Sequence, residues 1–525
     1  MPGCRENTRQ EDCDINPAGE SEIVASEAQN VKTKRVKPAG TQADVRALAA
    51  QLEAITPRLA EISADEKLRL AERIKAIQEI EDIGRSHEGV AARGFFEASR
   101  AGQEEERRLW QISREFWAQL AAAYNACLAA HIRGDGLDGG KTDLTHLVIR
   151  LLRAYQSRLK WDWFRHGPHS LGFWETIGHA YLYAMQEGVH QRFEKVYPGS
   201  AEPTSVEREY LRILMLQASS LDRLLPLEIR IVEEVVDHFL PDFSFSAKRL
   251  EGHTHWVDAA RRRPPARLMG EKMETSPVQR FFGPGAALSG LAEVADCLRQ
   301  GEAAPQFRIT RYFSPRVILP VLQHLTTYWA PTPPRRRYTR YQAQSRMAVI
   351  SGLTQINLHL CGAAAEALGV NENSEPRRCE WMIDNISRDG IGAQLRLATS
   401  RVTEEVRIGT LICMRPEGVN QWLVGVVRRF SRETEEHGLV GIETLTRAPL
   451  LTEVDCGGQR EQALLLNKPR LGRTVRLVLR AGTGLCTKAP LLLPVEGKTA
   501  HLINGKLVET GIAFDIARYR VESLV

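Results

Sequence analysis

The strongest constraint on the fold is a change in hydrophobic patterning near Arg340. Before this point apolar residues recur at steps of three and four, as in "DVRALAAQLEAI", which is typical of amphipathic helices. After it, short apolar runs such as "WLVGVVRRF" and "GLVGIETL" alternate with Gly, Asn and charged clusters, which is typical of strands. We therefore expect a multidomain α+β protein of 525 residues, with a long α-helical N-terminal region followed by an antiparallel β-barrel and a further small β domain.

Shifts in composition divide the chain into five expected segments. Residues 1–42 are polar with few large apolar side chains, which predicts a disordered leader. The segments behind it are expected to be a helical region (43–240), a mixed α/β connector (241–330), a β-barrel preceded by an arginine linker (331–446) and a C-terminal β domain (447–525).

Local patterns predict where individual elements begin and end. "TSVE" at Thr204–Glu207 predicts a capping box, in which the Thr204 hydroxyl covers an N–H of the first helical turn. The run at 346–358 predicts a strand, and residues 361–378 are expected to form an insertion, partly helical, between the first two strands of the barrel. Asn504-Gly505 between two apolar runs predicts a two-residue hairpin turn.

Charge and cysteine content narrow the class of protein. A net charge of +5 is too small to favour a protein that coats nucleic acid, so an anion site would have to come from local clustering. No apolar run approaches the roughly 18 residues that a membrane span needs, and the N-terminus shows no secretory signal. The nine cysteines are scattered without a CxxC pair, which favours a reducing cytoplasm over a disulfide framework.

Catalytic and metal-binding patterns are weak. No spacing of Ser, His, Asp, Cys or paired carboxylates indicates a catalytic site, so we do not expect an enzyme. His166 with His169, and His253 with His255, have metal-like spacing, but no cysteine or carboxylate cluster completes either pair. The Gly-rich run 283–290 precedes a helix without a P-loop lysine, which favours a plain helix entry over a phosphate site.

The segment "APTPPRRRYTR" (330–340) holds four arginines within six residues, directly after three prolines. The prolines restrict the free chain and so lower the cost of ordering it around a ligand. A guanidinium group can bind a phosphate with two hydrogen bonds, pair with guanine or stack on a base. In an extended segment, Arg336 and Arg340 would face the same side.

A second polar cluster follows in "DNISRDGIG" (384–392). Asn385 and Ser387 can offer short polar side chains beside the end of a strand. Gly390 would permit a turn with positive φ and a close approach of the backbone to a ligand. The two clusters are therefore candidates for one binding site.

The order of these clusters resembles the PilZ domain family, a small β-barrel that binds the bacterial second messenger cyclic di-GMP. The resembling pattern is R-x-x-x-R followed by N-x-S-x-x-G, with strand-like runs behind it, and it covers about residues 335–446. Many members have Asp where this chain has Asn385. The resemblance implies a binding site for cyclic di-GMP made by Arg336, Arg340, Asn385, Ser387 and Gly390, with Arg335 and Arg337 as further contacts.

These observations predict a cyclic di-GMP receptor without any other cofactor, in which the helical region binds a protein partner. The arginine linker lies between the two halves of the sequence, so ligand binding would order it and fix the helical region against the barrel. One alternative is a ligand-independent adaptor or scaffold with a degenerate barrel. Another is nucleic-acid binding by the arginine cluster, which predicts a steep salt dependence and which the small net charge disfavours.

Overall fold

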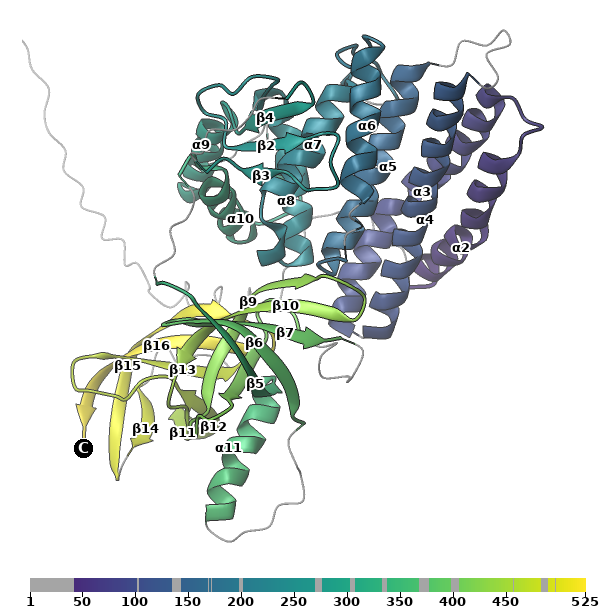
Figure 1. Cartoon of the computed structure of the whole chain (residues 1–525). Helices are drawn as coiled ribbons and strands as arrows, with labels where there is room; N and C mark the ends of the chain where they lie inside the picture. Colours follow the sequence, from purple (N-terminus) through teal and green to yellow (C-terminus); the bar gives the residue numbers. More distant parts are fainter. Residues whose placement is uncertain are drawn as a thin grey trace, which may run out of the picture.

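The computed structural model describes most of the chain beyond the predicted leader. The described residues are 42–101, 103–134, 143–168, 170, 172–197, 202–269, 276–302, 307–332, 338–367, 377–397, 406–456, 458–482, 490–495 and 497–525. Apart from residue 42, the leader lies outside them. The expected order of a helical region, an antiparallel barrel and a further β domain is confirmed, and the last β domain is itself a closed barrel (Figure 1).

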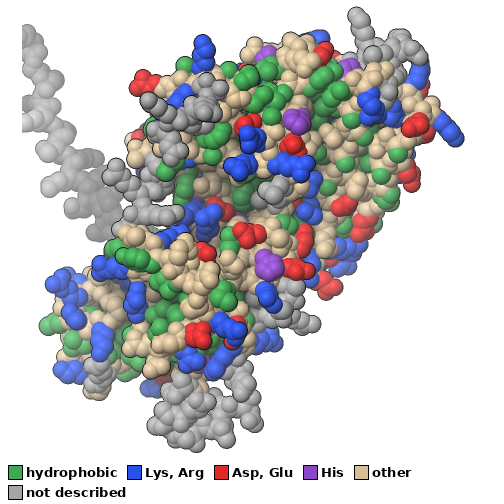
Figure 2. All heavy atoms as spheres, viewed as in Figure 1, with side chains coloured by type: hydrophobic (Ala, Val, Ile, Leu, Met, Phe, Trp, Pro, Cys, Tyr) green, Lys and Arg blue, Asp and Glu red, His purple; other side chains and the backbone are tan. Residues whose placement is uncertain are grey.

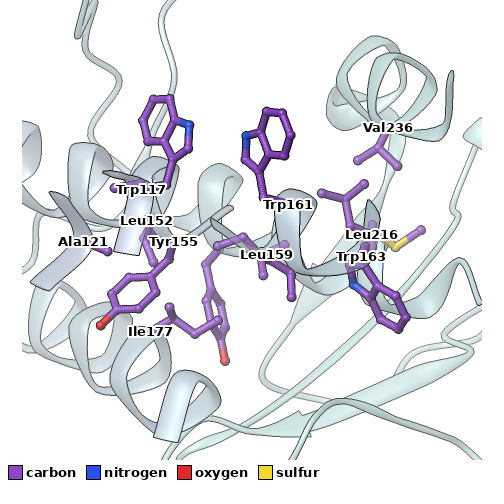
Figure 3. Close-up of a cluster of buried hydrophobic side chains, with 14 of the residues drawn as sticks. Trp117, Ala121, Leu152, Tyr155, Leu159, Trp161, Trp163, Ile177, Leu216 and Val236 are labelled. Atoms are coloured by element: carbon purple, nitrogen blue, oxygen red, sulfur yellow. The ribbon is translucent and has the colours of Figure 1, made fainter. Parts of the chain in front are cut away.

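Long helices that lie side by side form the N-terminal region (Figure 1). Most residues of α5 are buried, and its aromatic side chains meet those of the neighbouring helices in one core (Figure 3). Trp161, for example, packs edge-on against Phe95 with ring centroids 5.7 Å apart. The helices are α2 (Gln42–Ala64), α3 (Leu70–Ala101), α4 (Gln103–Arg133), α5 (Leu144–Phe164), α6 (Gly172–Gln186), α7 (Val206–Ala218) and α8 (Pro226–His238).

Buried charges also join these helices. Glu81 on α3 is fully buried and accepts hydrogen bonds from Arg150 on α5, from Tyr124 on α4 (2.5 Å) and from Tyr197. A buried carboxylate is tolerated only when its oxygens are paired in this way. The network therefore fixes the relative positions of α3, α4 and α5.

The start of α7 corrects the predicted capping box. The N-cap is Ser205, whose hydroxyl accepts the N–H of Arg208 at 3.2 Å. Thr204 instead donates its hydroxyl to the buried carboxylate of Glu209 at 2.6 Å. Burial alone would raise the pKa of Glu209, but Arg212 and Arg153 outweigh it and hold the pKa at about 2. The stronger acceptor thus takes the Thr204 hydroxyl away from the helix terminus.

A small sheet and two helices complete the N-terminal half. The sheet is antiparallel with strand order β1-β4-β2-β3, and its Phe282 shares one continuous core with the long helices. Gly178 on α6 lies so close to the sheet that a Cβ there would be 1.9 Å from the Ala259 carbonyl oxygen. The elements are η1 (Leu221–Arg223), η2 (Leu240–Asp242), β1 (Ser244–Ser246), β2 (His255–Asp258), β3 (Ala266–Arg267), β4 (Gln279–Gly283), α9 (Ala287–Arg299), η3 (Arg308–Arg311) and α10 (Pro315–Trp329).

The first barrel is closed, with strand order β10-β7-β6-β5-β8-β9. The predicted strand at 346–358 is wrong in its second half, because α11 begins at Leu353. Gly352 has φ of +83°, which ends the strand, and Leu353, Ile356 and Leu360 then follow a helical spacing. The elements are β5 (Tyr341–Ser351), α11 (Leu353–Ala367), β6 (Cys379–Ser387), β7 (Gly390–Arg396), β8 (Leu411–Pro416), β9 (Leu423–Arg432) and β10 (His437–Thr446).

The second barrel is also closed, with strand order β11-β12-β13-β16-β15-β14. Asn504-Gly505 is not a hairpin turn, as predicted, but a bulge within β15, where the register against β16 shifts between Ile503 and Lys506. Asn504 has φ of +55°, and because Asn tolerates a left-handed backbone it occurs in bulges as well as in tight turns. The strands are β11 (Leu450–Cys456), β12 (Gln459–Leu465), β13 (Thr474–Arg480), β14 (Leu491–Val495), β15 (Lys498–Thr510) and β16 (Phe514–Leu524).

The three parts contact one another directly. A shared apolar cluster, which includes Ile356 of α11, Val424 of the first barrel and Phe514 of the second, joins the two barrels. Towards the helical region, the N–H of Arg432 donates to the carbonyl of His166 at 2.7 Å. Strands β9 and β10 thus lie directly below the helices (Figure 1).

Candidate functional site

A hollow of about 440 Å³ lies on the outer face of the first barrel, next to the helical region. Lys and Arg side chains lie along the crease between the two halves, together with Asp and Glu side chains (Figure 2). The hollow is lined mainly by β6, β7, β9 and β10, with one residue from η1. Its lining residues are Arg223, Tyr338, Arg340, Asp384, Asn385, Ser387, Asp389, Gly390, Ile391, Gly392, Ala393, Arg428, Arg429, Leu439, Val440, Gly441, Ile442 and Glu443.

Two glycines form the floor of the hollow. Asn385 on β6 pairs with Gly392 on β7, Gly392 pairs with Gly441 on β10, and Gly441 pairs with Arg429 on β9. Directly paired residues share one face of a sheet, and this is the outer face, because the alternate positions are buried in the barrel core: Ile391, Ala393, Val440 and Ile442. Two positions without side chains thus lie between Asn385 and Arg429, over roughly 14 Å of sheet.

A β-bulge brings two arginines to the same edge of the hollow. Gly441 and Ile442 are consecutive on β10, but they pair with Arg429 and Val427 on β9, which leaves Arg428 as the extra residue. Both arginines therefore line the hollow, although neighbouring residues of a regular strand point to opposite faces.

Tight packing of glycine positions shapes the other end of the hollow. A Cβ at Gly392 would lie 2.6 Å from Nδ2 of Asn385, so the glycine leaves room for that amide, which donates to the Asp384 carboxylate at 2.7 Å. A Cβ at Gly390 would lie 2.6 Å from the carbonyl oxygen of Ile442. The predicted positive φ at Gly390 is wrong, since its φ lies outside the left-handed region, and the close approach is to a neighbouring strand.

The structure brings four of the seven predicted site residues together. Arg340, Asn385, Ser387 and Gly390 all line the hollow. Arg340 is placed there because the next residue, Tyr341, begins β5 opposite Ile386 near the end of β6. Ser387 Oγ donates to the carbonyl of Gly390 at 3.2 Å across the hairpin. The other three predicted residues, Arg335, Arg336 and Arg337, lie outside the described residues.

Several lining residues were missed in the sequence. The Arg428-Arg429 doublet could have been noticed as a pair of charges inside an otherwise apolar run. Gly441 interrupts a strand pattern, which often marks a close approach of another group. Arg223 carries no such signal, because it lies more than a hundred residues away from the barrel in sequence.

The arginines of the hollow differ in how their charges are balanced. Arg428 donates through Nε to Glu443 at 2.7 Å and through Nη2 to Glu509 of the second barrel at 2.7 Å. Burial alone would lower the pKa of Arg428, but these carboxylates outweigh it and raise the pKa. Arg429 pairs with Asp222 of η1. Arg223 lies over the ring of Tyr328, with its guanidinium carbon 5.6 Å from the ring centroid.

Comparison with known proteins adds an observation about the other half of the chain. Residues 41–249 match the family model described as "Cyclic-di-GMP receptor FimW, N-terminal domain". The match covers the helical region, whereas the residues that resemble the PilZ family lie in the first barrel. The match covers less than half of the chain. A search of curated proteins finds no match.

Among solved structures, the chain is similar to "Crystal structure of the Borreliella burgdorferi PlzA protein in complex with c-di-GMP". The sequences are 12% identical, and the match covers 33% of this chain and 86% of that one. The TM-score is 0.12, a value too low to show a shared fold.

The histidine pairs noted in the sequence fall only partly within the described residues. Within the described ranges, no three His, Cys, Asp or Glu side chains are grouped so that they could hold a metal ion. His255 stacks on Phe282, and burial lowers its pKa to about 3. His169 lies outside the described residues. None of the described helices is both long and apolar enough to cross a membrane.

Proposed function

We propose that this protein is a receptor for cyclic di-GMP and that its first barrel, within residues 331–446, is a PilZ-like sensor. The observation that carries the proposal is that Arg340, Asn385, Ser387 and Gly390 line one hollow on the outer face of that barrel. Asn385, Ser387 and Gly390 belong to one short segment, and the pairing of β5 with β6 brings the distant Arg340 to the same hollow. The match of the helical region to the N-terminal domain of a cyclic di-GMP receptor supports the same ligand independently.

The hollow suits the chemistry of a cyclic dinucleotide. Its volume of about 440 Å³ is within the usual range for small-molecule sites, about 300–1,000 Å³. Gly441 presents bare backbone on the floor of the hollow, on which a flat base can lie, and the Asn385 amide covers Gly392 beside it. Arg340 supplies a guanidinium for a phosphate or for guanine O6 and N7, and Asn385 and Ser387 supply short polar groups at the rim.

We further propose that the ligand couples the barrel to the helical region. The hollow is bounded on one side by η1 of the helical region and on the other by barrel strands, so a ligand there contacts both. Arg335, Arg336 and Arg337 belong to the sequence segment that connects the two parts, and they would add contacts to the bound ligand. Ligand binding would then favour one arrangement of the helical region, which we propose as the surface for a protein partner.

Calorimetric titration of the purified chain with cyclic di-GMP tests the proposal, with GMP as the matched control ligand. We expect saturable binding of cyclic di-GMP that GMP does not reproduce, because GMP offers one phosphate and one base. Absence of binding would leave the ligand-independent adaptor as the better account. Small-angle scattering with and without the ligand tests the coupling, and identical profiles would contradict it.

A further inference from the structure

The 3-10 helix η1 (Leu221–Arg223) is the part of the helical region that reaches the hollow. Its position is set by the residue before its N-cap, because Ser219 is fully buried and bound from α10. The carbonyl of Ser219 bonds with Nε2 of His324 at 2.7 Å, and its hydroxyl accepts Nε1–H of Trp329 at 3.0 Å. The segment is thus anchored in the helical core immediately before it enters the crease.

An ion pair connects η1 to the barrel from the other side. Asp222 is largely buried and binds the guanidinium of Arg429, which is a lining residue of the hollow. A partly buried, charge-assisted contact of this kind is worth more than an exposed ion pair. Anchors on both sides therefore hold η1 at the edge of the hollow.

Arg223 is the residue of η1 that lines the hollow, and its charge is balanced differently from those beside it. The charge of Arg428 is shared by two carboxylates and that of Arg429 is paired with Asp222. Among the described residues no carboxylate forms an ion pair with Arg223, whose guanidinium lies over the ring of Tyr328. A half-buried guanidinium over an aromatic ring is held in place, and its N–H groups can still bind an anion.

We propose that Arg223 is a ligand-binding residue that the helical region contributes to the barrel site, with Asp222 as the residue that positions it. This inference rests on the proposed function and assigns Arg223 to a phosphate or a guanine edge of the same cyclic dinucleotide. Affinity then depends on the docking of η1 against β9, so the ligand is sensed by both parts of the protein together.

The test is calorimetry of the full chain with cyclic di-GMP at one fixed salt concentration. Arg223→Ala is expected to weaken binding by about 10- to 100-fold, the usual cost of losing a charge-assisted hydrogen bond. The matched control is Arg308→Ala, an exposed arginine of η3 that does not line the hollow, and it should bind as the unchanged chain does. Thermal unfolding without ligand should give nearly the same midpoint for both variants.

Repeating the Arg223→Ala substitution in the Asp222→Asn variant tests whether Asp222 positions Arg223 for the ligand. In Asp222→Asn, η1 loses its ion pair with the barrel, so the further change Arg223→Ala should weaken binding less than about threefold. If a folded Arg223→Ala variant binds with the affinity of the unchanged chain, the proposed role of Arg223 is wrong. If Arg223→Ala weakens binding by the same factor with Asp222 and with Asn at position 222, the positioning role of Asp222 is wrong. If the unchanged chain does not bind cyclic di-GMP, the proposed function fails and this inference fails with it, a result distinct from the other two.

Discussion

The glycine floor of the hollow gives the sharpest mutational prediction. Gly441→Val places a branched side chain on the outer face of β10, at the centre of the row between Asn385 and Arg429. The new Cβ would lie 3.3 Å from Cβ of Arg429, a contact that a shift of a few tenths of an ångström relieves. Valine also suits a strand better than glycine, by about 0.5–1 kcal/mol, so the free energy of unfolding should change by less than about 1 kcal/mol.

The same substitution should be costly for the ligand. The added atoms occupy the floor of a cavity of about 440 Å³, and such overpacking costs about 1–3 kcal/mol, or about 5- to 150-fold in affinity. Calorimetry with cyclic di-GMP measures the loss, and thermal unfolding without ligand verifies the fold. The matched control is Gln394→Val, which adds the same side chain at an exposed position of β7 that does not line the hollow. If Gly441→Val folds normally and binds as tightly as the control, the ligand does not lie on this floor.

Three further predictions concern other parts of the molecule. Arg340→Ala should weaken cyclic di-GMP binding by about 10- to 100-fold, since it removes a charge-assisted contact of about 1.5–3 kcal/mol, and calorimetry would show unchanged affinity if Arg340 has no role. Gly178→Ala should lower the free energy of unfolding in urea by about 3 kcal/mol, because its Cβ would lie 1.9 Å from the carbonyl oxygen of Ala259. Gly89→Ala, with no atom within 4 Å of the new Cβ, should instead stabilise helix α3 by about 0.5–1 kcal/mol. Equal effects of the two substitutions would refute the packing argument. The pKa of Glu209 is held at about 2, below its ordinary value of 4.5, so its contribution to stability is present above pH 4.5 and is lost as the pH falls towards 2. Glu209→Gln should therefore reduce the loss of stability between pH 4.5 and pH 2 in urea unfolding. An unchanged pH dependence of stability over this range would contradict the prediction.

The order of helices and barrels could be predicted because it depends on local periodicity, which the sequence carries directly. The wrong predictions concern segments whose local sequence is compatible with two different structures. Asn504-Gly505 permits a left-handed backbone, and tertiary pairing of β15 with β16 turned it into a bulge. Leu353 and Ile356 read as part of a strand, but Gly352 ended β5 and the same apolar residues became the packing face of α11.

The candidate site could be predicted only where its residues form a linear motif. Asn385 and Ser387 lie on one strand and Arg340 lies directly before the paired strand, so a sequence pattern can represent them. Arg223 reaches the hollow only through the packing of the helical region against β9, and Arg428 lines it only because of a bulge. Contacts of this kind depend on tertiary structure and cannot be predicted from the spacing of residues within a short segment.

A crystal structure of the full chain with cyclic di-GMP tests the central claim most directly. We expect the ligand to lie over Gly441, beside the Asn385 amide that covers Gly392, with Arg340 and Arg223 on its phosphates or guanine edges. A dinucleotide bound elsewhere on the molecule, or a hollow that stays empty at saturating ligand, would contradict it.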